Sequence, residues 1–80
     1  MHRIVVDVML KPEILDPQGQ AVANALPELG FGTPASLRIG KHVALELEAD
    51  DAAQALERAT TMAQVLLANP VIEDFTVRFA

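Results

Sequence analysis

The sequence predicts a small α+β domain with the element order βαββαβ, formed by all of residues 1–80. Three observations lead to this class. Several stretches alternate apolar and polar residues, as strands do. Two longer stretches place apolar residues at helical spacing behind an Asp that can cap a helix. Pro and Gly residues separate these stretches. The natural closure is the ferredoxin-like two-layer sandwich, a four-stranded antiparallel sheet with two helices on one face.

The first strand is predicted over residues 2–10, where every second residue is apolar and β-branched residues are frequent. Lys11-Pro12 ends this strand, because proline has no N–H to donate to a sheet. Asp16-Pro17 then begins a helix, since Asp is a favoured N-cap and proline at the first helical position loses a donor that has no partner there.

This first helix has one apolar stripe, formed by Val22, Ala25, Leu26 and Leu29, which we expect to be buried. Gly30 fits the position after the helix, where a left-handed residue closes it. Pro27 removes the hydrogen bond to the carbonyl of Ala23, and therefore predicts a kink or early fraying.

A short second strand is predicted from Ser36 to Ile39, and Gly40-Lys41 looks like a hairpin turn. The third strand then runs from His42 to Glu48. Its alternation turns three apolar residues toward the core, namely Val43, Leu45 and Leu47.

Asp50 or Asp51 caps a second helix that runs to about Leu67 and is rich in alanine on more than one side. Asn69-Pro70 ends it. The last strand is predicted from Ile72 to Phe79. Met9 and Met62 are interpreted as core fillers.

The composition limits what the chain can do. Eighty residues bury only roughly 60–65% of their unfolded surface, so the core is small. There is no cysteine, which excludes disulfides, thiolate metal sites and thiol catalysis. Oligomerisation is then the usual way to stabilise so small a domain, and the hydrophobic fraction of 51% favours burial of apolar surface against partners.

The charge and the aromatic content exclude a further class. A net charge of −5 with only three Phe and no Tyr or Trp gives no basic, stacking surface for nucleic acid. No apolar run reaches membrane-spanning length and the N-terminus lacks a signal-peptide pattern. We therefore expect a cytoplasmic protein.

A search for chemistry finds no catalytic device. Glu46 and Glu48 share a strand face and read best as solvated acids. His2 and His42 have no partners at metal-ligand spacing; His2 is expected in a frayed terminus and His42 beside the turn. No phosphate-binding glycine pattern is present. Lys41 could hold an anion or a partner's carboxylate, although an exposed lysine is the simpler interpretation.

Three segments together resemble the PurS family, the small subunit of phosphoribosylformylglycinamidine synthase. They are LKPEILDPQGQAVANALPELGF (10–31), LRIGKHVALELE (37–48) and LLANPVIEDF (66–75), and their order and spacing cover nearly the whole chain. The positions of this chain that match the family's motif are Lys11, Pro12, Asp16, Pro17, Gln18, Gly19, Arg38, Gly40, Lys41, Asn69 and Pro70.

The resemblance implies a subunit without catalytic residues, in a complex that makes formylglycinamidine ribonucleotide from formylglycinamide ribonucleotide, ATP and glutamine in purine biosynthesis. It implies a homodimer or higher homo-oligomer that bridges a PurL-type synthetase and a PurQ-type glutaminase and supports ammonia transfer. ATP and Mg belong to the complex, and no cofactor is expected on this chain. The subunit contacts are expected at Lys11, Gln18, Gly19, Arg38 and Lys41.

The alternative is an ACT-like regulatory domain, which also has the order βαββαβ and is often dimeric. It would bind a small molecule at a helix–loop junction, where Gly19 or Gly32 could lie. A ligand that raises thermal stability would favour this alternative.

Overall fold

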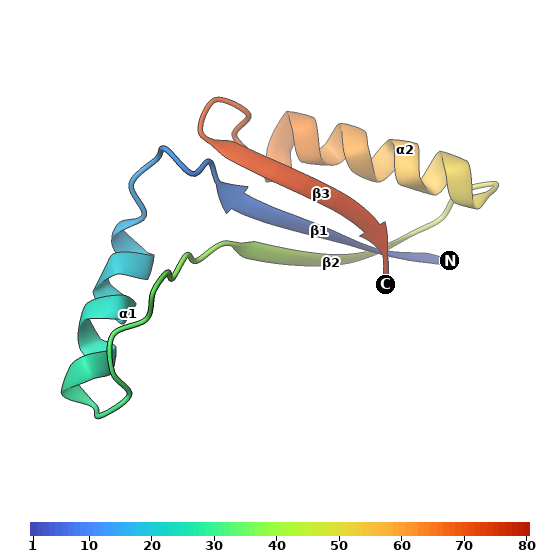
Figure 1. Ribbon diagram of the computed structural model, residues 1–80. Coiled ribbons are helices and arrows are strands. Elements are labelled where there is room, and N and C mark those ends of the chain that lie inside the picture. Colours follow the sequence, from blue (N-terminus) through green and yellow to red (C-terminus); the bar gives the residue numbers. More distant parts are fainter.

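The computed structural model describes residues 1–80 and is built around the long strand β1, His2–Leu10. This strand lies at the centre of a three-stranded antiparallel sheet in the order β2-β1-β3, with β2 at Lys41–Leu47 and β3 at Glu73–Phe79 (Figure 1). Val6 lies opposite Val43 in β2 and Val77 in β3. The predicted alternation is confirmed, because Ile4, Val6 and Val8 are fully buried on the face that meets the second helix.

That helix, α2 (Ala52–Met62), continues into a π-helical turn, η1 (Ala63–Leu67), and ends where the sequence predicts. Asp51 caps it by accepting a hydrogen bond from the Gln54 N–H at 2.8 Å. Its buried face is made of the fully buried alanines Ala55, Ala59 and Ala63. Because alanine adds only a methyl group, the helix axis can approach β1 closely and bury the large β1 side chains. These strands and helices form the body of the molecule.

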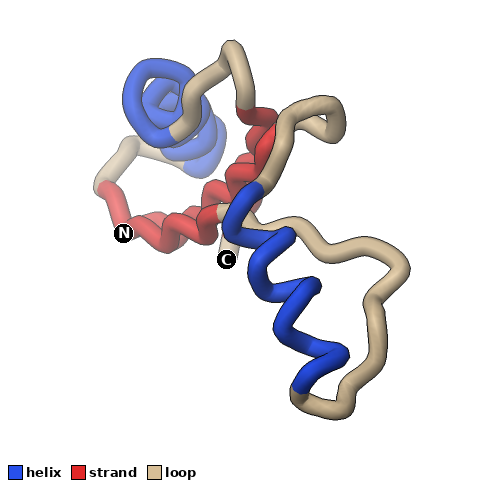
Figure 2. Tube along the Cα trace, turned by 90° about the vertical axis from the view of Figure 1, so that its left-hand side faces the viewer, coloured by secondary structure: helices blue, strands red, loops and turns tan.

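The helix α1, Pro17–Glu28, does not lie on the sheet. It projects from one end of the body, and the chain returns along it through residues 29–40 (Figures 1 and 2). We call residues 11–40 the arm. Asp16 caps α1 and Pro17 is its first residue, as predicted. At the tip, Gly30 and Gly32 have φ of 90° and 78°, the left-handed region in which glycine is favoured, and they reverse the chain.

The expected α+β class with an antiparallel sheet is confirmed, whereas four strands with two helices on one face are not shown, because the sheet of this chain has three strands and α2 alone packs on it. The segment Ser36 to Ile39 is extended but belongs to no sheet, and Gly40 does not form a hairpin. Asp16 holds this segment against the start of α1 by accepting the Ile39 N–H at 2.7 Å. Arg38 holds it as well, by donating to the carbonyl oxygens of Lys11 and Ile14. These long-range bonds are not visible in periodicity.

Of the two effects expected of Pro27, a kink or early fraying, the structure shows an early end of α1. The helix stops one residue later, and its last turn is tightened by bonds to carbonyls three residues back, from Leu29 to Leu26 and from Gly30 to Pro27. The stripe of α1 contributes nothing to the core: Gly19 is the buried residue of this helix, and Leu29 is 70% exposed.

Three smaller expectations are corrected. His2 is part of β1 and pairs with Leu47 instead of fraying. Met9 and Met62 are not core fillers, since they are 40% and 42% exposed. Met9 faces the open side of the sheet, and Met62 lies at the border of the buried alanine face of α2, one helical turn after Ala59.

The shape that results is elongated. The radius of gyration is 15.9 Å, whereas a compact chain of this length has about 12 Å. The chain is also mostly exposed, with 10 of its 80 residues buried, and nearly all of these lie in the body. The body thus has the small core that the sequence predicts, and the arm has none of its own.

Candidate subunit interface at the base of the arm

The residues expected to contact other subunits gather where the arm joins the body. Gln18 and Lys41 line an open hollow of about 290 Å³ at this junction, together with Leu10, Asp16, Pro17, Ile39, Gly40 and Glu73. Gly19 lies behind Asp16, and Lys11 and Arg38 meet on the arm side. Residues from three separate segments are thereby brought to one place, and we call it the basal hollow.

Asp16 is the centre of this junction. Its buried carboxylate accepts the Gly19 N–H at 2.9 Å with one oxygen and the Ile39 N–H at 2.7 Å with the other. These two backbone hydrogen bonds, the first being the larger cause, hold the pKa of Asp16 below its usual value. A helix cap predicted from local sequence therefore also joins the two sides of the arm.

Gly19 is required by this packing. A Cβ at this position would collide with the carboxylate of Asp16 and would lie 3.1 Å from the carbonyl oxygen of Leu37. The residue lets the first turn of α1 lie directly against the return segment. Gly19 therefore shapes the arm from within, while its expected contact with a partner stays a prediction.

Arg38 also works inside the arm. One guanidinium nitrogen, Nη2, donates to the carbonyl oxygen of Lys11 at 3.1 Å and to that of Ile14 at 2.7 Å. The side chain closes the loop between β1 and α1 while the residue as a whole stays exposed. Like Gly19, Arg38 stabilises the shape of the arm, and Lys11 and Gln18 lie on the surface of that arm.

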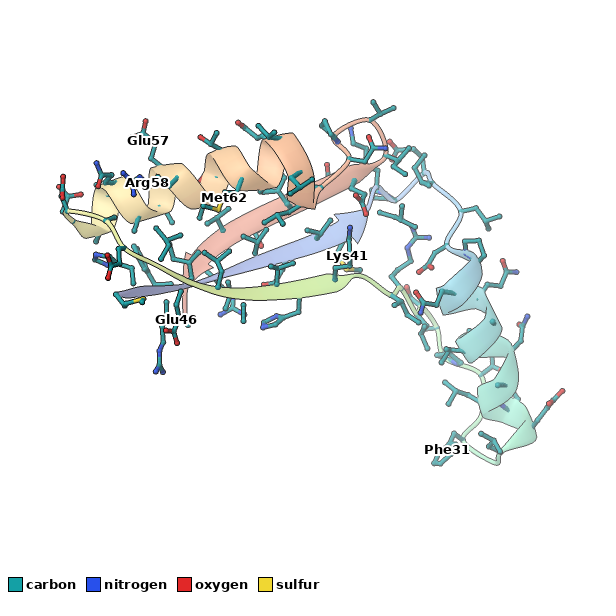
Figure 3. All side chains as sticks on the ribbon, turned by 180° about the vertical axis from the view of Figure 1, so that it is seen from behind. Phe31, Lys41, Glu46, Glu57, Arg58 and Met62 are labelled. Carbon is teal, nitrogen blue, oxygen red and sulfur yellow. The ribbon has the colours of Figure 1, made fainter.

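Lys41, the first residue of β2, lies at the end of the body that carries the arm and links β2 to the end of η1 (Figure 3). Its ammonium donates to the carbonyl oxygen of Leu67 at 3.2 Å and lies 3.8 Å from a carboxylate oxygen of Glu73. Glu73 in turn accepts the Asn69 N–H at 2.6 Å. Lys41 thus satisfies a free carbonyl at the end of η1, and it remains more than half exposed to a partner.

The open face of the sheet carries a charge cluster that sequence reasoning missed. Asp7 lies 2.7 Å from His42 and 3.2 Å from Arg78, one residue from each outer strand. The hydrogen bond with His42 and then the pair with Arg78, partly offset by burial, hold the pKa of Asp7 below its usual value. Alternation places all three residues outward, but only the strand register brings them together.

No group of three or more His, Asp or Glu side chains could hold a metal ion. The chain has no helix that is both long and apolar enough to cross a membrane. What it does present is exposed apolar surface along the arm, including Leu15, Val22, Leu29 and Phe31.

Comparison with known proteins decides the family. A family model for PurS, described as phosphoribosylformylglycinamidine (FGAM) synthase, matches residues 3–80. The chain belongs to the PurS family. Among curated PurS subunits, the one from Mycobacterium leprae is 53% identical over 77 residues, which cover 96% of this chain and 94% of the relative. The ACT-like alternative receives no support.

Solved PurS structures share the elongated shape. The purS subunit from Thermotoga maritima is 32% identical and superposes with a TM-score of 0.92 over 99% of this chain and 91% of its own. A structure described as PurLQS from the same organism gives a TM-score of 0.91 at 32% identity, over 99% of this chain and 96% of the other. Because these superpositions include nearly every residue, the projecting arm is common to these PurS structures.

Proposed function

We propose that this chain is the small subunit of a phosphoribosylformylglycinamidine synthase complex, in which it binds partners and carries no catalytic residue. The observation that carries the proposal is the PurS match over residues 3–80, extended by the superposition on PurLQS. Its partners would be a PurL-type synthetase and a PurQ-type glutaminase. ATP and Mg would be bound by the complex elsewhere, and the site of action would be the cytoplasm.

The mechanism that we infer is positioning. Ammonia released from glutamine at one active site is lost to water unless it reaches the second site directly. A small subunit that holds two larger ones in register shortens that transfer without supplying a proton-transfer group. The polar groups of this chain support such a role, because they are bonded to the backbone: Asp16 and Arg38 hold the two sides of the arm together, and Lys41 links β2 to the end of η1.

Within this function we assign the basal hollow to subunit contact. Gln18 and Lys41 line it with exposed side chains, and Lys11 stands beside it. Gly19 and Arg38 would act through the shape of the arm, since the first is buried and the second is bonded to two backbone carbonyls.

We further assign the chain to a homodimer or a higher homo-oligomer. Its accessible surface is 5587 Å², about 900 Å² more than the roughly 4700 Å² expected of a compact monomer of 8.6 kDa. That excess is similar to the roughly 800 Å² that each partner buries in a standard interface.

Reconstitution tests the function. The glutaminase and the synthetase are assayed with and without this chain, first with glutamine and then with ammonium salt. Glutamine-dependent synthesis should need the chain far more than ammonia-dependent synthesis does. Equal glutamine-dependent rates with and without the chain would refute the proposal that it bridges the two larger subunits.

The hollow can be tested in the same assay with two glutamines of α1. Gln18→Glu places a negative charge in the basal hollow, whereas Gln20→Glu places the same charge on an exposed position outside it. Assembly, followed by size-exclusion chromatography, should weaken for the first variant and not for the second. Equal binding by both variants would show that the hollow is not a contact surface.

A further inference from the structure

One turn of the body has a role that the contacts described above do not explain. Residues 68–72 connect η1 to β3, and Figure 1 shows them standing out from the end of the body at which the arm begins. We call this segment the Asn69 turn. Asn69 and Pro70 match the motif noted in the sequence, yet neither of them lines the basal hollow. The tip of the turn is apolar, because Val71 is 77% exposed and Pro70 is exposed beside it.

The Asn69 turn is held in one conformation by its own hydrogen bonds. The carbonyl oxygen of Asn69 accepts the Ile72 N–H at 3.1 Å and the Glu73 N–H at 2.7 Å. Its side-chain oxygen accepts the Val71 N–H at 3.1 Å, and its own N–H donates to the Glu73 carboxylate at 2.6 Å. Asparagine at the first position and proline at the second are also favoured in a β-turn. Every N–H between Asn69 and Glu73 is therefore bonded within the turn, since Pro70 has none.

This arrangement suits the turn to binding an apolar pocket. The polar backbone groups are used inside the turn, so its tip offers a partner mainly the side chains of Pro70 and Val71. A segment that is already ordered loses little conformational entropy when it binds. The exposed valine also contributes nothing to the core of its own chain.

The Asn69 turn is continuous with the basal hollow. Glu73 belongs to both, because its carboxylate accepts the Asn69 N–H and its side chain lines the hollow. Lys41 lies 3.8 Å from that carboxylate and donates to the carbonyl oxygen of Leu67, directly before the turn. A partner that covers the hollow would therefore reach the tip of the turn as well.

We propose that Pro70 and Val71 dock into an apolar pocket of the synthetase-type subunit. This inference rests on the proposed function and names one contact within it. A second copy of the chain does not fit, because two-fold symmetry would set the same tip against itself, and two protruding tips cannot enclose each other. We choose the synthetase because a surface that extends from the hollow to the tip calls for a large partner, and the synthetase is the large subunit of the proposed complex.

Two valines of nearly equal exposure provide the test. Val71→Lys places a charge at the tip of the turn, and Val65→Lys places the same charge on η1, where Val65 is 78% exposed. Binding of each full-length chain to the immobilised synthetase is measured by surface plasmon resonance. We expect Val71→Lys to weaken binding by about tenfold or more, as for a central anchoring residue, and Val65→Lys by less than about twofold. Circular dichroism checks that both variants keep the fold.

Asn69→Ala tests whether the order of the turn matters. This variant loses the bond from the Val71 N–H but keeps both apolar side chains of the tip. Binding should weaken by about threefold, less than for Val71→Lys, because a looser turn must be ordered on binding. Amide hydrogen exchange at Val71 should increase in the same variant. Faster exchange with binding equal to that of the wild type would overturn the role of Asn69.

The outcomes separate this contact from the proposed function. If the wild type binds the synthetase and Val71→Lys binds equally well, the contact is overturned and the proposed function is not. The glutaminase is assayed in parallel, and a loss of binding seen only with the glutaminase would also overturn the assignment to the synthetase. A wild-type chain that binds neither subunit would overturn both the contact and the proposed function.

Discussion

The body and the arm each contain an amphipathic helix with an aspartate cap, yet only one of the two helices is packed. In the body, α2 buries Ala55, Ala59 and Ala63 completely. In the arm, the apolar stripe of α1 lies against no other element. The difference teaches that caps and periodicity determine where a helix begins and which face is apolar. They do not determine which surface, or which molecule, covers that face.

The largest contrast should come from truncating one leucine-sized residue in each region. Ile4 is fully buried in the body, and its replacement by Ala should lower the free energy of unfolding by about 2–5 kcal/mol. Leu29 is 70% exposed, so Leu29→Ala should cost a monomer less than about 0.5 kcal/mol and act mainly on association. Denaturant titration at several protein concentrations measures both effects. Equal, concentration-independent losses would mean that the arm is packed within its own chain.

A second contrast lies inside the arm. Gly19→Ala places a methyl group against the Asp16 carboxylate and the Leu37 carbonyl, so the first turn of α1 must separate from the return segment. We expect amide hydrogen exchange to increase by tenfold or more in α1, as about 1.4 kcal/mol of local opening would produce, while β1 stays protected. The exposed neighbour Gln20→Ala is the control, and similar exchange in both variants would refute the role of Gly19.

The sequence predicts the body well because its contacts follow from alternation. The range of β1 is the expected one, the ends of β2 and β3 differ from the expected ends by at most one residue, and α2 with η1 ends at Leu67 as expected. The caps at Asp16 and Asp51 were also predictable, because capping is local chemistry.

The placement of the arm could not be predicted in the same way. It depends on the Asp16–Ile39 and Arg38–Ile14 bonds, which join residues 23 and 24 positions apart. The Asp7 cluster depends on strand register for the same reason. Of the five expected contact residues, Gly19 and Arg38 hold the arm together and Lys41 links β2 to η1. Such contacts leave no periodic pattern in a sequence.

Lys41 lies at the boundary between the two regions, because it belongs to β2 in the body and faces the base of the arm. Lys41→Gln removes its pair with Glu73 and weakens its bond to the Leu67 carbonyl, which should cost about 0.5–1 kcal/mol at this partly exposed position. Assembly with the partner subunits should weaken by more than this loss explains. Thermal unfolding and size-exclusion chromatography on the same samples separate the two effects. Loss of stability without loss of assembly would make Lys41 purely structural.

The smallest expected effect is a pH dependence confined to the arm. The pKa of Asp16 is lowered by the N–H groups of Gly19 and Ile39, so the charged carboxylate stabilises the folded arm. This contribution is fully present above the unfolded aspartate pKa of about 3.9 and is lost as the pH falls through the lower folded value. Amide exchange at Ile39 should therefore increase below about pH 4 in the wild type. Asp16→Asn should remove this dependence, and an unchanged profile would contradict the assignment.

The central claim, that the arm is built for another molecule, is tested most directly by the mass of the chain in solution. Light scattering at micromolar concentration should give a multiple of 8.6 kDa for the wild type. Val22→Asp/Leu29→Asp should give 8.6 kDa with an unchanged far-ultraviolet circular dichroism spectrum, because the charges fall on the exposed stripe of α1 and not in the core. A wild type that is monomeric, or a variant that associates as the wild type does, would contradict the account.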